Sequence, residues 1–170
     1  IGERPKPWTH VQNIVVAAKE DRDGNLTESR MCIHVRHINA EAKMSHYPTQ
    51  RVDDCLAKAA EKSFFSKLDA RSGFSQIPIA LEDQPKTAFW WRGIAWMYTR
   101  APFGLTNIPA HFQEAMDTIL AMEGLQEFAT CYVDDILIYS DTADEHVIHV
   151  CLVLKALFKN NLKAHPDKSI

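Results

Sequence analysis

The sequence lacks the cysteine pairs and the long apolar runs that mark several classes of protein. Its four cysteines are widely spaced, with no Cys-x-x-Cys pair, at Cys32, Cys55, Cys131 and Cys151. This spacing argues against a structural zinc site and favours a reducing compartment. No apolar run approaches the ~20 residues of a transmembrane helix and no signal peptide opens the chain, so no membrane partner is expected.

An excess of positive charge is missing as well. The chain carries 19 Lys and Arg against 22 Asp and Glu, a net charge of -3. A protein that binds nucleic acid over its whole surface is usually basic, so any such binding here depends on local patches. The bulk composition, 46% hydrophobic and 24% charged over 170 residues, is that of one globular domain with a core.

Among the residues that are present, two adjacent acids, Asp134 and Asp135, are the most informative. They lie between apolar runs at residues 128–133 and 136–139, which predict two buried strands in a hairpin with the acids at its tip. Carboxylates so close together repel unless a cation lies between them, and Mg²⁺ prefers such hard oxygen ligands. Taken alone, the pair is also typical of an ordinary turn, in which Asp is favoured.

A third acid, Asp69, follows an apolar strand predicted at residues 64–68. If this strand joins the hairpin in one sheet, three carboxylates converge at the same edge. Such a cluster is typical of sites that hold two divalent ions for phosphoryl transfer.

The remaining segments predict an α+β fold, with an antiparallel sheet backed by helices on one face. Further strands are expected at residues 14–18, 30–35, 76–81, 88–91 and 96–100. Helices are expected at residues 49–62, from 107 or 108 to 124, and 142–160. The last helix begins with a capping box at Thr142 and Glu145, and its apolar stripe consists of Val147, Val150, Cys151, Leu154 and Phe158.

Six blocks of sequence follow one another in a recognisable order. They are residues 30–39, 65–74 (Phe-Ser-Lys-Leu-Asp-Ala-Arg-Ser-Gly-Phe), 86–89, 102–113, 132–140 (Tyr-Val-Asp-Asp-Ile-Leu-Ile-Tyr-Ser) and 162–168. In these blocks the chain resembles the reverse transcriptase domain of gypsy-type LTR retrotransposons, which is part of a retroviral-type Pol polyprotein. The resemblance covers nearly the whole chain.

The resemblance implies a polymerase palm with part of the fingers subdomain. Residues 1–62 would belong to the fingers and residues 63–170 to the palm, with a fingers-like hairpin inserted at about 82–101. The thumb, connection and RNase H domains are expected outside the chain.

The activity implied is that of an RNA-directed DNA polymerase, which transfers a nucleotide from a dNTP to a primer 3′-hydroxyl on an RNA or DNA template. The implied partners are a primer–template, dNTPs, and the downstream thumb and RNase H domains. The implied location is intracellular, in a cytoplasmic retroelement particle or in the nucleus.

Carried over residue by residue, the resemblance implies a catalytic set of Asp69, Asp134, Asp135 and Lys168. Two Mg²⁺ ions, or Mn²⁺ in their place, would be held by the three acids and by the backbone carbonyl of Ala70. Lys168 would donate a proton to the departing pyrophosphate or stabilise its charge.

The other implied roles are nucleotide binding by Arg30, Phe74, Phe103 and Gly104, and template or primer binding by Arg36, Tyr132 and Pro109. Phe74 would lie under the ribose and exclude a 2′-hydroxyl. The family usually has Asp where His34 stands and His or Trp where Ser75 stands. These departures leave open an inactive remnant that keeps the fold and binds nucleic acid or protein, and a two-metal nuclease is a further alternative.

Overall fold

The computed structural model describes residues 11–20, 25–48 and 51–170. They fall into two compact units. The first unit reaches to Met44 and includes Phe74–Thr106, and the second unit combines Ser45–Gly73 with Asn107–Ile170. These bounds differ from the segments 1–62 and 63–170 expected from the sequence, and the assignment of fingers and palm stays a prediction.

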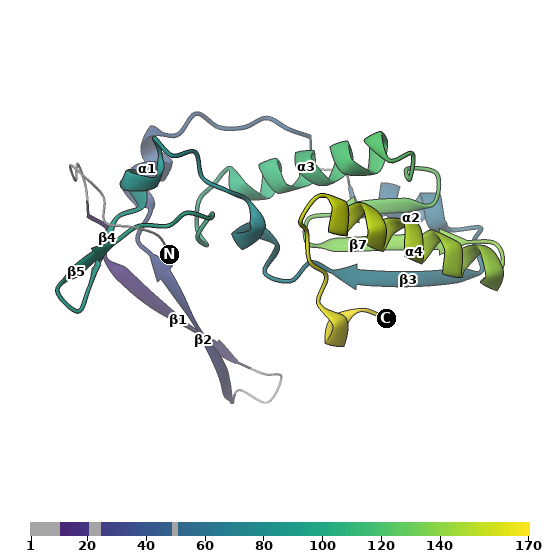
Figure 1. Ribbon diagram of the computed structural model, residues 1–170, viewed down its shortest axis with the longest axis horizontal. Coiled ribbons are helices and arrows are strands. Elements are labelled where there is room, and N and C mark those ends of the chain that lie inside the picture. Colours follow the sequence, from purple (N-terminus) through teal and green to yellow (C-terminus); the bar gives the residue numbers. More distant parts are fainter. Residues whose placement is uncertain (1–10, 21–24, 49–50) are drawn as a thin grey trace. The chain divides into compact units, whose positions relative to one another are not determined.

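The second unit is built on a three-stranded antiparallel sheet (Figure 1). Its strands are β3 (Phe64–Asp69), β6 (Ala129–Tyr132) and β7 (Asp135–Ser140), in the order β3-β7-β6. Strand alternation sends one set of side chains into the core, and these are Leu68, Cys131, Ile136 and Ile138. The predicted strands at residues 64–68, 128–133 and 136–139 are thus confirmed.

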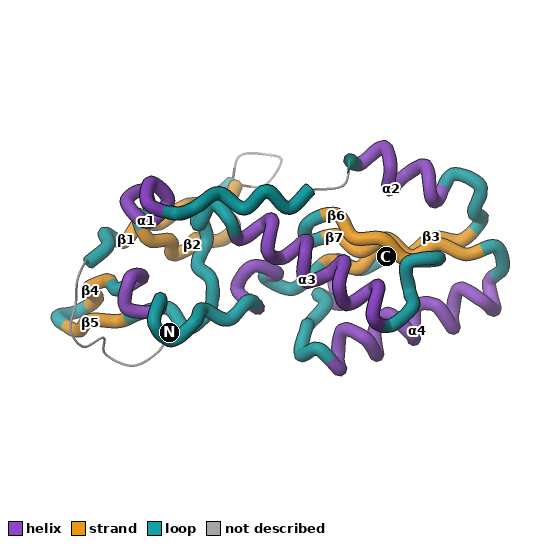
Figure 2. The backbone as a smooth tube through the Cα atoms, turned by 90° about the horizontal axis from the view of Figure 1, so that it is seen from above, coloured by secondary structure: helices purple, strands orange, loops and turns teal. Residues whose placement is uncertain are grey.

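Helices cover both faces of this sheet, and not one face as expected from the sequence (Figure 2). On one face lie α3 (Ile108–Met122) and α4 (Ala143–Lys159). On the other lies α2 (Val52–Ala59), where the Thr130 hydroxyl donates to Cys55 Sγ at 3.7 Å.

The ends of α3 and α4 follow from their sequences. Pro109 occupies the first turn of α3, where a missing N–H costs nothing, and Gly124 ends it with φ +70°. At the start of α4, Thr142 and Glu145 form the predicted capping box through reciprocal hydrogen bonds of 3.3 Å.

The predicted apolar stripe of α4 is wrong. Of its members, Val147, Cys151, Leu154 and Phe158 are exposed, and the helix instead buries Val153, Ala156 and Leu157. Because α4 carries apolar residues on two sides, periodicity alone could not decide which side faces the sheet.

The described part of the first unit contains two antiparallel hairpins, a short α-helix and a 3₁₀ helix (Gln84–Thr87). The elements are β1 (Ile14–Glu20), β2 (Leu26–Ile33), α1 (Arg36–Glu41), β4 (Phe89–Trp91) and β5 (Ile94–Trp96). Ile33, Val35 and Phe89 form its small buried core. The sequence did not predict α1, and it placed the second strand of the β4–β5 hairpin too late, at residues 96–100.

The strand predicted at residues 76–81 does not form. A 3₁₀ helix (Gly73–Gln76) precedes an extended segment that makes only an isolated bridge between Pro78 and Arg100. The bridge is held by two hydrogen bonds, from the Ile79 amide to the Thr99 carbonyl at 3.0 Å and from the Ala101 amide to the Ile77 carbonyl at 2.9 Å, and no named strand forms around it. None of the helices in the described ranges has both the length and the apolarity to span a membrane.

Candidate active site

The three acids singled out in the sequence lie at one end of the second unit's sheet. Asp69 is the last residue of β3, and its partner across the strands is Asp135, the first residue of β7. The amide of Ala70 donates to the carbonyl of Asp134 at 2.8 Å. The backbone therefore fixes the spacing of the acids by strand pairing and not by a flexible loop.

The turn that carries Asp134 is strained, and a side chain of α3 holds it in place. Val133 has φ +53°, a conformation in which a β-branched residue is an outlier. Gln113 of α3, which is fully buried, accepts a hydrogen bond from the Val133 amide and donates one to the Cys131 carbonyl, both at 2.8 Å. Its amide nitrogen also donates to Asp117 at 3.0 Å. A strained turn persists only where its surroundings over-determine it, and Gln113 supplies that constraint.

Gln113 is the last residue of the family block at residues 102–113, and no role was predicted for it. A signal was present, because Gln113 shares a helix face with Met116 and Leu120, at spacings of three and seven residues. A polar side chain on a buried stripe needs hydrogen-bond partners, and here they belong to the turn beside the acids.

Gly73 makes room for the Asp134 side chain. A Cβ atom built on Gly73 would collide with Asp134 Oδ1 and would lie 3.1 Å from Phe112 and 3.3 Å from Ala70. The same Oδ1 atom is shielded from solvent. The carboxylate of Asp134 is thus packed against a position that only glycine fills without displacement.

Asp135 is in a different environment from Asp134. Its Oδ2 atom lies 2.8 Å from the ammonium of Lys67, across the β3–β7 ladder, and both side chains are almost half exposed. This hydrogen bond raises the pKa of Lys67, against the opposing effect of desolvation, and the charges of Asp135 and Asp69 add to the rise. The ammonium therefore balances part of the negative charge at the sheet end.

The donor atoms at this end suit a hard cation. Among the described residues no three His, Cys, Asp or Glu side chains gather closely enough to hold a metal ion together. Mg²⁺ does not require that, because it is commonly held by one or two carboxylates, with water and substrate phosphates completing its shell. The packed carboxylate of Asp134 and the neighbouring Asp69 fit that requirement.

The remaining predicted residues of this unit lie in different settings. Tyr132 is 39% exposed and pairs across the strands with Asp135, whereas Pro109 is exposed in the first turn of α3. Lys168 is exposed in a 3₁₀ helix (Pro166–Lys168) on the chain segment that borders β3. Within that segment the amide of His165 donates to the Asp69 carbonyl at 2.7 Å.

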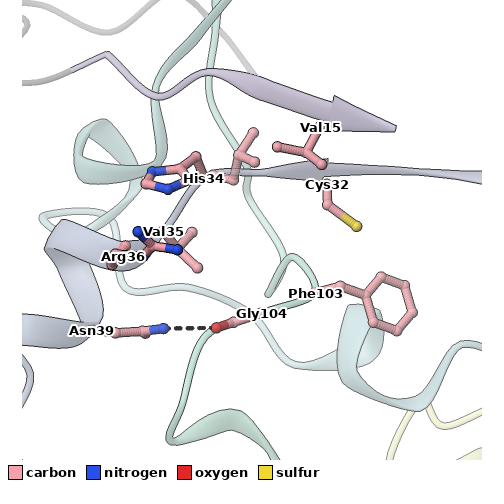
Figure 3. Close-up of a pocket in the computed structure, with 9 residues that line it drawn as sticks. Val15, Cys32, His34, Val35, Arg36, Asn39, Phe103 and Gly104 are labelled. Atoms are coloured by element: carbon pink, nitrogen blue, oxygen red, sulfur yellow. Dashed lines mark hydrogen bonds between the residues drawn. The ribbon is translucent and has the colours of Figure 1, made fainter. Parts of the chain in front are cut away.

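Several predicted nucleotide- and template-binding residues belong to the first unit. Arg36, Phe103 and Gly104 line one pocket of about 470 Å³ (Figure 3). Gly104 has φ +99°, and a Cβ there would lie 3.2 Å from Val35. Sequence reasoning missed Asn39 in the same pocket, whose side chain donates to the Gly104 carbonyl at 2.8 Å.

Two further predicted residues lie in this unit outside that pocket lining. Phe74 packs edge-on against Phe103, with ring centroids 6.2 Å apart. Arg30 pairs with Ala17 in the β1–β2 ladder, and its side chain lies outside the described part of the structure.

Comparison with known proteins identifies the family of the chain. The family model described as reverse transcriptase (RNA-dependent DNA polymerase) matches residues 18–170. The chain belongs to the reverse transcriptase family. This confirms the resemblance seen in the sequence blocks.

Curated relatives carry the same resemblance. The chain is 35% identical over 163 residues to a Drosophila melanogaster retrovirus-related Pol polyprotein from transposon gypsy, and 36% identical over 154 residues to that from transposon 297. These alignments cover 96% and 91% of the chain but only 16% and 14% of the polyproteins. An RNA-directed DNA polymerase homolog of Oenothera berteroana is 39% identical over 127 residues, which are 73% of the chain and 89% of that protein.

Solved reverse transcriptases share the fold. A foamy viral protease-reverse transcriptase in complex with double-stranded DNA matches with a TM-score of 0.83 at 27% identity, over 96% of this chain and 28% of that one. A second foamy viral structure, in complex with an RNA/DNA hybrid, matches with a TM-score of 0.78 at 26% identity, over 95% of this chain and 21% of that one. The α+β polymerase fold expected from the sequence is confirmed.

Proposed function

We propose that this chain is the catalytic core of an RNA-directed DNA polymerase that extends a primer 3′-hydroxyl with dNTPs. The observation that carries the proposal is the sheet end where Asp69 and Asp135 pair across the strands and Asp134 stands in a clamped turn. Membership of the reverse transcriptase family supports it. A primer–template of RNA or DNA would be the polymer substrate, as in the foamy viral complexes with DNA and with an RNA/DNA hybrid.

In this proposal the acids hold the reacting groups in line. The primer 3′-hydroxyl loses its proton to solvent and its oxygen bonds to the α-phosphorus, while the bond from that phosphorus to the oxygen bridging to the β-phosphate breaks and pyrophosphate leaves. Asp69 and Asp134, with the Ala70 carbonyl, would hold two Mg²⁺ ions, or Mn²⁺. When bound, the divalent cations supply Lewis-acid stabilisation of the attacking and leaving oxygens. Asp135, paired with Lys67, sets the local charge near the primer end.

Other residues would act on the nucleotide and the template. Lys168 would give a proton to the leaving pyrophosphate or stabilise its charge. Arg30, Phe103 and Gly104 would contact the dNTP, while Arg36, Tyr132 and Pro109 would contact template or primer. Downstream thumb and RNase H domains would be further partners, since the chain spans about one sixth of the Pol polyproteins that it matches.

The decisive experiment is dNTP incorporation on an oligonucleotide-primed RNA template with Mg²⁺ or Mn²⁺. Asp134→Asn should reduce incorporation to background because it removes a metal-binding charge. Asp141→Asn is the matched control, since Asp141 follows β7 in the same unit and pairs with Lys62. Undiminished incorporation by Asp134→Asn would contradict the proposal, and template degradation without incorporation would favour a nuclease.

The same assay, with the downstream domains restored, distinguishes an active polymerase from an inactive remnant. If wild type then incorporates nothing and binds no Mn²⁺ that depends on Asp69 and Asp134, the remnant is favoured. The departures at His34 and Ser75 motivate this alternative, and the Lys67 ammonium beside Asp135 adds to it, because it already neutralises one acid without a metal.

Sugar selection gives a second test that leaves the metal site intact. Phe74→Val should admit rNTPs, because a smaller side chain under the ribose leaves space for the 2′-hydroxyl. The measurement is the ratio of dNTP to rNTP incorporation efficiency in wild type and variant. An unchanged ratio would show that Phe74 does not lie under the ribose.

A further inference from the structure

The tip of the β4–β5 hairpin exposes two tryptophans that the polymerase chemistry does not use. Trp90 is 48% exposed and Trp91 is 49% exposed, although tryptophan is among the residues most buried on average. They are consecutive in a strand, so their rings project from opposite faces of the hairpin. By contrast, Trp96 of the partner strand packs on the unit's core with Phe89. Core packing therefore explains Trp96 but not the exposed ring of Trp91.

The tip is cationic as well as aromatic. The guanidinium carbon of Arg92 lies 5.6 Å from the centroid of the Trp91 ring, within cation–π range. Residues 84–106 contain no Asp or Glu, although the chain carries 22 of them, and they include Lys86, Arg92 and Arg100. Lys86 is paired with Asp83, so Arg92 is the cation that accompanies the exposed rings. A polyanion is the charge-complementary partner for this acid-free segment.

The turn at the tip of the hairpin is also preformed. Arg92 has φ +51° and Gly93 has φ +74°, which gives the two-residue turn that matches the twist of a hairpin. A preformed turn holds the two rings in place and lowers the entropy that a ligand must overcome.

We propose that this hairpin tip stacks unpaired nucleobases of a single-stranded nucleic acid, one base on the Trp91 ring beside Arg92 and another on the Trp90 ring of the opposite face. Aromatic rings stack on bases of any sequence, and a nearby cation attracts the phosphates, a combination that recurs in single-strand binding proteins. Bases in a duplex are already stacked on one another, so single strands should bind more tightly than duplexes. This proposal rests on the proposed function in one respect, that a polynucleotide is the substrate.

The test is the affinity of the 170-residue chain for a fluorescein-labelled oligothymidylate, measured by fluorescence anisotropy. Trp91→Ala and Trp90→Ala should each weaken binding about tenfold, while Trp91→Phe should keep most of it. Arg92→Gln should weaken binding and lower the salt dependence by about one counterion. Phe158→Ala is the matched control, because Phe158 is an aromatic residue 84% exposed in the other unit.

Each alternative result has a fixed meaning. Equal affinity of wild type, Trp90→Ala and Trp91→Ala overturns the proposal, and so does a duplex that binds as tightly as the single strand. A blue shift of tryptophan fluorescence with phosphatidylserine vesicles, but not with oligothymidylate, would assign the tip to a lipid surface and also overturn it. Oligothymidylate binding is measured without dNTP or divalent cation, so a failed incorporation assay and a failed stacking site are told apart.

Discussion

The two units of this chain hold their functional residues in opposite ways. In the second unit the acids lie at the end of a sheet covered on both faces, next to the fully buried Gln113 and the close contact of Gly73. In the first unit the candidate recognition residues lie on hairpins and on an open pocket around a core of three buried residues. Bond making needs fixed geometry, whereas recognition of a polymer tolerates side chains at the surface.

The largest expected effect comes from truncating the core of each unit. Phe112 in the second unit and Phe89 in the first are each 1% exposed. Replacement of either by alanine should lower the free energy of unfolding by about 3–5 kcal/mol. Hydrogen exchange should then show loss of protection in β6 and β7 for Phe112→Ala, and in β4 and β5 for Phe89→Ala. Equal loss in both units from either variant would show that the two units unfold together.

A smaller loss is expected when the clamp under the turn is removed. Gln113→Leu leaves the Val133 amide and the Cys131 carbonyl without their buried partner, which should cost about 3 kcal/mol in urea unfolding. Gln126→Leu is the matched control, since Gln126 is exposed and should change stability by less than about 0.5 kcal/mol. If the two variants proved equally stable, Gln113 would not hold the turn.

Much of the second unit could be predicted from the sequence, because its signals are local. Apolar runs on either side of Asp134 specify two strands, and Thr142 with Glu145 specifies the start of α4. The clamp was not predictable in this way, since Gln113 reaches a turn 20 residues further along the chain. The face of α4 was also ambiguous, because only packing selects Val153 over an equally apolar neighbour.

The first unit was harder to predict because its strands are short and its apolar residues are sparse. The run at residues 76–81 alternates like a strand, but in the structure it makes only the isolated bridge between Pro78 and Arg100. Arg36–Glu41 forms a helix of only six residues, too short for periodicity to reveal. The role of Asn39 in the candidate site could not be predicted either, because its hydrogen bond to Gly104 joins residues 65 positions apart.

The contact at Gly73 gives a test that separates site geometry from backbone strain. Gly73→Ala should cost about 2 kcal/mol of stability and reduce Mg²⁺-dependent incorporation, because the new methyl displaces Asp134 Oδ1. Gly124→Ala is the control, since Gly124 has φ +70° and open space around it, and should cost about 1 kcal/mol. Normal incorporation by Gly73→Ala would mean that the carboxylate tolerates displacement.

The smallest effect concerns the ion pair at the sheet end. The folded-state pKa of Lys67 is raised above its ordinary value, mainly by its hydrogen bond to Asp135. The ion pair therefore stabilises the folded state fully at pH values below the pKa of Lys67 in the unfolded chain. This stabilisation is lost as pH rises through the higher folded-state pKa, above about pH 10. Because the side chains are 49% and 45% exposed, Lys67→Met should lose only about 0.5 kcal/mol at neutral pH.

The difference in unfolding free energy between wild type and Lys67→Met should disappear in urea titrations above that pH. Lys155→Met is the control in the same unit, since Lys155 is exposed on α4. A difference for Lys67→Met that persisted at high pH would assign the effect to packing of the lysine stem. A difference in unfolding free energy that disappears at high pH would show that the charged ammonium of Lys67, and not its apolar stem, balances the charge of Asp135 at this end of the sheet.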